Sequence, residues 1–339
     1  MNRRKFIIGA IAGGVGLAEY IYTSEYMNQL ADPSRDLSVK EYARYGAQAA
    51  LAAITPNDQF YITSKGDTPR VEASSWRLKI DGLVAHPIEI PYDQLLGLPR
   101  IERILTLECI SNPIGGHAIG NAQWTGTPLK PLLERAHPAP EASHVIIEAA
   151  DGYSTGHPIE RIWNEYNFLA YRMNGDPLPP VHGYPARIFI PGKFGMKQPK
   201  WITRIRFVNR PYLGYWETRG WSDDAERWAQ ARFTDLKDGA KLRGRNIELF
   251  GYAVGNLDGI KAVELSFDGG RAWQNADIFS NPSPLVWVFW KFRWNPPQRG
   301  KYEILVRAVD GKGGIEGADP LGIYPAGATG LQRVKVTVV

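Results

Sequence analysis

The side chain with the most chemistry to offer is Cys109, the only cysteine among 339 residues. A single thiol cannot form an internal disulfide, a zinc cluster or an iron–sulfur site, because each of these needs several sulfurs from the chain. The remaining roles are a packed, inert thiol, a nucleophile, or the lone protein ligand to a metal. Free cysteines are mostly buried and inert, so the residues around Cys109 must decide between these roles.

Several kinds of catalytic site find no support in the sequence. A cysteine protease would need a paired histidine, and although His117 follows in the same loop, the sequence does not fix the geometry of such a pair. Nucleotide cofactors are disfavoured, because neither a Gly-x-Gly-x-x-Gly motif nor a Walker loop follows a predicted strand.

Length and composition are typical of a globular chain with about two domains. Hydrophobic residues make up 44% of the chain and charged residues 22%, which are ordinary proportions. The net charge of +5 comes from scattered basic residues. Because no basic stripe is interleaved with aromatic residues, nucleic acid is not an expected partner.

The first residues resemble an export signal. Paired arginines at positions 3 and 4 precede a short apolar, glycine-rich stretch. This order is typical of a twin-arginine signal, whose route carries folded proteins. We therefore expect residues 1–30 to be a twin-arginine-like signal or an N-terminal membrane anchor, and residues 31–53 to be a linker. The protein is then exported, periplasmic or otherwise extracytoplasmic, and an uncleaved segment would anchor it to the membrane.

Alternating patterns and turn residues predict an α+β fold in two domains. A mixed α+β domain is expected over residues 54–235, and an all-β, immunoglobulin-like sandwich over residues 240–339. Expected strands of the first domain are at residues 76–80, 101–109, 145–149 and 186–190, and expected short helices are at residues 92–98 and 129–136. Expected strands of the sandwich are at residues 247–254, 260–267, 285–292, 302–309 and 334–338. Gly115, Gly116 and Gly120 predict a loop after Cys109.

Several motifs follow one another along the chain. They are Thr106-Leu107-Glu108-Cys109-Ile110-Ser111-Asn112, Trp124-Thr125-Gly126-Thr127-Pro128-Leu129, Leu169-Ala170-Tyr171-Arg172-Met173-Asn174-Gly175, His182-Gly183-Tyr184-Pro185-Ala186-Arg187 and Lys200-Trp201. Their residues and their order resemble the sulfite oxidase family of molybdenum enzymes. The similarity extends from about Thr55 through the sandwich, so it covers nearly the whole chain after the predicted signal.

The resemblance implies that Cys109 is the metal ligand, supplying one thiolate to molybdenum. The other sulfurs would come from the dithiolene of a molybdenum–molybdopterin cofactor, so a single cysteine suffices. The family's cofactor-contacting positions match Tyr61, Thr63, Ser64, Lys65, Asp151, His182, Arg187, Gln198 and Lys200. Arg187 suits the cofactor's phosphate, because a guanidinium offers several donors to phosphate oxygens. Trp124, Trp221 and His117 are expected to line the catalytic pocket with Cys109.

The substrate-binding part of the family pattern is incomplete. Sulfite-oxidising members hold their anion with arginines, whereas Thr63, Pro113 and Ile114 occupy those regions here. A dianion would lose much of its charge-assisted binding without them. Arginines that could substitute from elsewhere are Arg161, Arg172, Arg204 and Arg219. We predict a cell-envelope oxidoreductase that transfers an oxygen atom to or from a small molecule other than sulfite.

Alternatives stay open at this point. Within the family they are a sulfite dehydrogenase and a periplasmic reductase of sulfoxides, including methionine sulfoxide in proteins. From another class, a cofactor-free β-sandwich protein would bind partners and keep Cys109 as a buried structural thiol. No Cys-x-x-Cys-His motif or cytochrome-like region is visible, so we expect a separate electron carrier, either a cytochrome or a membrane quinone system. By analogy with the family, the sandwich is expected to form a homodimer.

Overall fold

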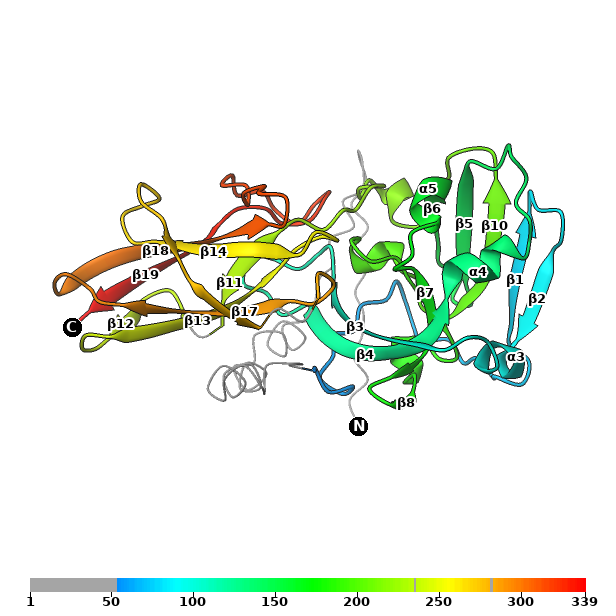
Figure 1. Ribbon diagram of the computed structural model, residues 1–339, viewed down its shortest axis with the longest axis horizontal. Coiled ribbons are helices and arrows are strands. Elements are labelled where there is room, and N and C mark those ends of the chain that lie inside the picture. The colour runs from blue at the N-terminus through cyan, green and yellow to red at the C-terminus, as the bar shows by residue number, and fades with distance from the viewer. Residues whose placement is uncertain (1–53, 235, 281–282) are drawn as a thin grey trace, which may run out of the picture.

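The computed structural model describes residues 54–234, 236–280 and 283–339. The predicted signal or anchor (residues 1–30) and linker (residues 31–53) lie outside the described residues. The first domain and the sandwich occupy opposite ends of the molecule, and strands β3 (Ile101–Glu108) and β4 (Ile119–Pro128) curve between them (Figure 1). Within the described ranges, no helix has both the length and the apolarity required to cross a membrane.

Two sheets and a few short helices make up the first domain. One sheet has the order β2-β1-β10-β5-β6, in which β1 and β10 run parallel; the other has the order β3-β4-β7-β8, with β9 paired to β7. The remaining strands are β1 (Arg77–Gly82), β2 (Ile88–Pro91), β5 (His144–Ala149), β6 (Ser154–Pro158), β7 (Phe168–Met173), β8 (Asp176–Pro177), β9 (Arg187–Phe189) and β10 (Ile202–Val208). The helices are α3 (Tyr92–Leu96), α4 (Leu129–Glu134) and α5 (Ile159–Ile162), with 3-10 helices at Pro180–His182, Gly195–Lys197 and Glu217–Arg219.

The second domain is a sandwich of two sheets with a shared apolar core. Their orders are β11-β13-β17-β16 and β12-β19-β18-β14-β15. The strands are β11 (Gln230–Phe233), β12 (Ala240–Leu242), β13 (Ile247–Val254), β14 (Ile260–Ser266), β15 (Gln274–Asn275), β16 (Asp277–Ser280), β17 (Val288–Trp294), β18 (Gly300–Asp310) and β19 (Gln332–Val338). Val263, Trp290 and Val306 are fully buried between the sheets. Alternate residues point inward because side chains alternate along a strand.

The predicted fold class is confirmed, with mostly β structure and few short helices. Strand β13 covers the predicted residues 247–254, whereas β17 runs from Val288 to Trp294 instead of over residues 285–292. Strand β17 starts later than predicted because the residues before Val288 form hydrogen bonds with the first domain instead. The carbonyl of Leu285 accepts from the amide of Thr106, and the amide of Trp287 donates to Thr106 Oγ1 at 2.9 Å.

The expected loop around Gly120 is wrong, because this glycine lies within β4 and pairs with Leu107 of β3. A glycine is needed at position 120 because the ring of Phe60 packs closely against it. A Cβ atom added at position 120 would lie 2.7 Å from Cε2 of Phe60, so a larger residue would displace that ring. Glycine here permits close packing of a ring against a strand, which the sequence alone does not distinguish from a turn.

The junction between the domains holds the end of β3. Thr106 takes part through its amide and hydroxyl, and its carbonyl accepts a 2.7 Å hydrogen bond from Nη1 of the buried Arg227. Around it an apolar cluster includes Trp287 and Phe289 of the sandwich, with Ile104 and Ile119 of the first domain packed against them. The strand that leads to Cys109 is therefore fixed against the second domain.

Candidate active site

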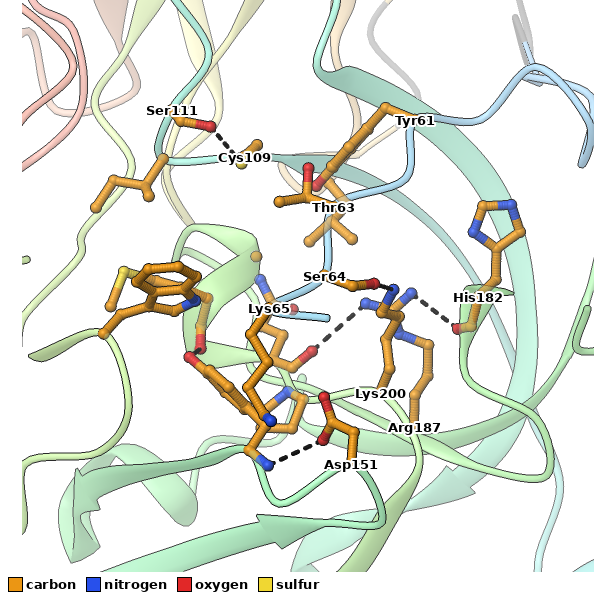
Figure 2. Close-up of a pocket in the computed structure, with 18 of the residues that line it drawn as sticks. Tyr61, Thr63, Ser64, Lys65, Cys109, Ser111, Asp151, His182, Arg187 and Lys200 are labelled. Atoms are coloured by element: carbon orange, nitrogen blue, oxygen red, sulfur yellow. Dashed lines mark hydrogen bonds between the residues drawn. The ribbon is translucent and has the colours of Figure 1, made fainter. Parts of the chain in front are cut away.

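A cavity with about 910 Å³ of empty space, partly open to solvent, lies beside Cys109. Figure 2 shows Cys109 and Ser111 on one side and Arg187, Lys200 and Asp151 on the other. The lining residues are Phe60, Tyr61, Thr63, Ser64, Lys65, Leu107, Cys109, Ile110, Ser111, Asp151, Tyr153, His182, Arg187, Gly195, Met196, Gln198, Pro199, Lys200, Trp201, Trp216 and Trp221.

Most residues selected from the sequence meet in this cavity. Those that line it are Tyr61, Thr63, Ser64, Lys65, Cys109, Asp151, His182, Arg187, Gln198, Lys200 and Trp221. Trp124 and His117 do not line it. Trp124 is fully buried, and Cζ of Arg187 lies 5.3 Å from the centre of its ring, so this tryptophan packs under Arg187. His117 is partly exposed in the loop between Cys109 and β4.

Cys109 follows β3 directly and is held by its backbone. Its amide donates to the carbonyl of Ala118 at 2.9 Å, where β4 is about to begin. The thiol is buried, with 7% of the residue exposed, and its sulfur lies 3.0 Å from Ser111 Oγ. The sulfur therefore faces the cavity from a short loop whose two ends are tied together.

Arg187 is a buried cation at the start of β9, which pairs with β7. Its guanidinium donates to the carbonyls of His182 at 3.1 Å and Gln198 at 3.4 Å, and its Cζ lies 4.6 Å from the ring centre of Phe189. Its Nε is buried without a hydrogen-bond partner. None of the carboxylates that the structure describes forms an ion pair with it.

Lys200 is the second cation of the cavity. Its Nζ donates to Ser64 Oγ at 2.6 Å and to the carbonyl of Val181 at 2.9 Å. Its position depends on Gly183, which adopts a left-handed conformation with φ of 118°. A Cβ atom there would lie 3.0 Å from Cβ of Arg187 and 3.2 Å from Cβ of Lys200, so glycine lets the turn and both cations approach one another.

Burial perturbs the charges of this group. It lowers the pKa of Lys200 to about 7, with a further reduction from Arg187, while Asp151 and Cys109 oppose the change. Burial also lowers the pKa of Arg187 to about 10 and that of His182 to about 4. His182 is therefore neutral near pH 7, and its Nε2–H donates to the carbonyl of Asn57 at 2.9 Å. An anionic group in the cavity would favour the charged forms of both cations.

Trp216 and Trp221 form an aromatic wall that closes the cavity near Cys109. Of these two residues, only Trp221 was selected from the sequence. The centres of these rings are 6.5 Å apart, and Trp221 meets the ring of Tyr324, from the sandwich, at 5.4 Å. Glu217 fixes the wall, because its Oε1 accepts a 2.7 Å hydrogen bond from Nζ of the fully buried Lys197. The concentration of aromatic residues over residues 215–221 was the available signal.

Two family models match the chain. Residues 65–216 match the oxidoreductase molybdopterin binding domain, and residues 230–320 match the Mo-co oxidoreductase dimerisation domain. The uncharacterized oxidoreductase YuiH of Bacillus subtilis (strain 168) is 32% identical over 176 residues, which are 52% of this chain and 87% of that protein. The chain belongs to the sulfite oxidase family of molybdopterin-binding oxidoreductases.

Other members share more of the chain at lower identity. The mitochondrial sulfite oxidase of Rattus norvegicus is 27% identical over 306 residues, covering 76% of this chain and 56% of that enzyme. The sulfite oxidase of Arabidopsis thaliana is 25% identical, covering 86% of this chain and 91% of that enzyme. The sulfane dehydrogenase SoxCD of Paracoccus pantotrophus has the same fold, with a TM-score of 0.69 and 23% identity over 83% of this chain and 80% of that chain.

None of the four arginines considered as substitutes lines the cavity. Arg161 pairs with Asp224 at 2.7 Å and Arg204 with Asp81 at 2.8 Å. Arg172 donates to the carbonyl of Gly175, and Arg219 lies over the ring of Tyr215. Pro113 and Ile114 do not line the cavity either, whereas Thr63 does, with its Oγ1 buried and without a hydrogen-bond partner.

The pKa of Lys200 predicts a pH-dependent anion site in the cofactor-free protein. Lys200 is charged below about pH 7 and neutral above it, so sulfate, which keeps its charge, should bind more weakly as the pH rises. Each pH unit above this pKa should raise the Kd of sulfate by up to about tenfold, because binding takes up one proton. Titration calorimetry in buffers of different ionisation enthalpy measures both the affinity and the proton.

The matched variant is Lys200→Arg, which keeps its charge across this range and should bind sulfate with little pH dependence. A native affinity that stays constant from about pH 6 to about pH 9 would contradict the assignment of Lys200 as the titrating cation.

Proposed function

We propose that the protein transfers an oxygen atom to or from a small, uncharged substrate at a molybdenum cofactor bound between Cys109 and two cations, the buried Arg187 and the partly buried Lys200. The observation that carries the proposal is the opposition of a lone thiol to Arg187 and Lys200 across one cavity (Figure 2). The alternative of a cofactor-free binding protein leaves unexplained why Arg187 and Lys200 are withdrawn from water although no carboxylate of the described residues forms an ion pair with either.

The residues present fit such a cofactor. Arg187 has a buried Nε without a partner, and Lys200 and Ser64 provide further polar groups at the same end. A phosphate would neutralise both cations and give Arg187 the acceptor that it lacks. Asp151, whose Oδ1 accepts from the amide of Tyr153, lines the cavity as an acceptor for amino groups of a pterin.

When bound, the cofactor supplies the redox centre that gains or loses the oxygen atom. The chain does the rest. Cys109 provides a thiolate to the metal, and Ser111 Oγ lies within hydrogen-bond distance of that sulfur. Arg187 and Lys200 orient the cofactor by its anionic part. Trp216 and Trp221 exclude water from the side of the cavity where substrate would meet the metal.

The substrate proposal rests on the apolar surroundings of Cys109. Ile110 and Met196 belong to one apolar cluster, against which Trp216 and Trp221 pack. Of the three cations that line the cavity, Arg187 and Lys200 lie on the side that we assign to the cofactor, and Lys65 Nζ lies 5.3 Å from the ring centre of Tyr215. A dianion such as sulfite would therefore find little compensation beside the metal, whereas a sulfoxide, including oxidised methionine, could pack its apolar groups against the tryptophans. The second candidate is a sulfite dehydrogenase.

Three further parts of the proposal, a homodimer, a separate electron carrier and export, rest on separate observations. The match of residues 230–320 to a dimerisation domain supports a homodimer through the sandwich. A separate electron carrier, a cytochrome or a membrane quinone system, is proposed because the sequence carries no haem-binding motif. Export is proposed only from the twin-arginine-like pattern in residues 1–30.

Protein purified from a molybdenum-sufficient host should contain molybdenum and a pterin that fluoresces after oxidation. Cys109→Ser should keep the fold, judged by circular dichroism and Tm, and lose more than about 100-fold in activity, since even changes beyond the direct ligands cost roughly 10- to 100-fold. Ser111→Ala, which keeps the thiol, is the control and should lose far less. Native protein without molybdenum, or an unchanged Cys109→Ser enzyme, would sink the proposal.

Thr63 stands where sulfite-oxidising members of the family carry an arginine, and this difference predicts how substrate preference would change if the arginine were restored. Thr63→Arg places a positive charge at the cavity wall and should raise kcat/KM for sulfite by roughly 10- to 100-fold, the effect expected of one charge-assisted hydrogen bond. Thr63→Gln adds bulk and polarity without charge and should not. For both variants, oxidation of sulfite is measured with an artificial electron acceptor, and reduction of a panel of sulfoxides is measured with an artificial electron donor. Native turnover of sulfite as efficient as that of Thr63→Arg would favour the sulfite dehydrogenase instead.

A further inference from the structure

Glu108 is a buried carboxylate next to Cys109 that the proposed reaction does not use. It ends β3, and 2% of the residue is exposed. Both of its oxygens accept hydrogen bonds: Oε1 from Asn112 Nδ2 at 2.9 Å, and Oε2 from Gln230 Nε2 at 2.6 Å. Because a buried charge without partners is costly, these two amides hold the carboxylate in one place.

Asn112 connects the fixed carboxylate of Glu108 to the loop that follows Cys109. While its Nδ2 is bound to Glu108, its Oδ1 accepts from the amide of Ala118 at 2.9 Å. Its backbone amide donates to the carbonyl of Cys109 at 3.0 Å, and the amide of Cys109 donates to the carbonyl of Ala118 at 2.9 Å. One side chain thus ties together both ends of the loop that presents the thiol.

The second donor to Glu108 comes from the sandwich. Gln230 begins β11, where it pairs with Val254 of β13, and it does not line the cavity. A further sandwich residue meets the same loop, because a Cβ atom added at Gly115 would lie 3.1 Å from Nε2 of Gln332. The loop of Cys109 is therefore supported from outside by side chains of the second domain.

We propose that Glu108 and Gln230 are positioning residues for Cys109, and that the sandwich contributes to the active site through Gln230. The proposal rests on the proposed function, in which Cys109 binds molybdenum. Gln230 acts through Glu108 and Asn112, since it touches neither the cavity nor the thiol. Side chains that orient metal ligands from behind commonly change metal affinity or activity by about 10- to 100-fold when they are removed.

Gln230→Ala in the holoenzyme removes the donor to Glu108 Oε2 and leaves the thiol itself unchanged. We expect an altered electron paramagnetic resonance signal of molybdenum and a kcat lower by about tenfold, with KM for substrate little changed. The matched control is Glu316→Gln. Glu316 is also buried and bonds the same strand, accepting from the amide of Ala231 at 2.9 Å and from Arg232 at 2.7 Å, but it does not contact the loop of Cys109. It should lower Tm while leaving the resonance signal unchanged.

The cofactor-free protein offers a second readout, because Cys109 is the only cysteine and a thiol reagent reports on it alone. Gln230→Ala should raise the rate of Cys109 modification by about tenfold through easier local opening, and Glu316→Gln should not. A native signal and a native modification rate in Gln230→Ala would overturn the inference, as would equal changes in both variants. Native protein without molybdenum would contradict the proposed function instead, and the modification rates would still decide whether Gln230 positions Cys109.

Discussion

Arg187 is buried and Lys200 partly buried, and no carboxylate of residues 54–339, as far as the structure describes them, forms an ion pair with either; this is the constraint on which the site depends. Burial lowers the pKa of both side chains, so their charged forms are disfavoured unless an anion lies beside them. An anionic ligand reverses this, since it stabilises the charged forms. The turn at Gly183 lets the two cations approach, and Trp124 and Phe189 pack against Arg187 from the other side. In the proposed enzyme, the thiol of Cys109 would bind the metal of the same ligand.

Contacts from both domains hold the residues around the cavity in place. Strand β3 is held to the sandwich at Thr106 and ends beside Cys109. At the aromatic wall, the amide of Ser222 donates to the carbonyl of Pro325 at 3.0 Å, next to the contact between Trp221 and Tyr324. Packing of the sandwich therefore affects the position of both Cys109 and the aromatic wall.

Contiguous motifs were the predictable part of the site, because neighbours in a tight turn stay neighbours in space. Residues 182–187 form such a turn, and sequence analysis selected both His182 and Arg187 from it. Regular alternation likewise predicted β13 to the residue. Trp124 shows the limit: its motif was recognised, but the side of the strand it occupies depends on packing beneath Arg187. Trp216 joins the cavity through the tertiary pair between Glu217 and Lys197, which no local pattern predicts.

The central claim is that one thiolate from the chain and the sulfurs of a cofactor bind the same molybdenum. X-ray absorption at the molybdenum edge measures this directly, because it counts the sulfur atoms around the metal. Native protein should show one more sulfur than Cys109→Ser, with an oxygen taking its place in the variant. The same number of sulfurs in both proteins would contradict the claim and leave Cys109 as a packed thiol beside the cavity.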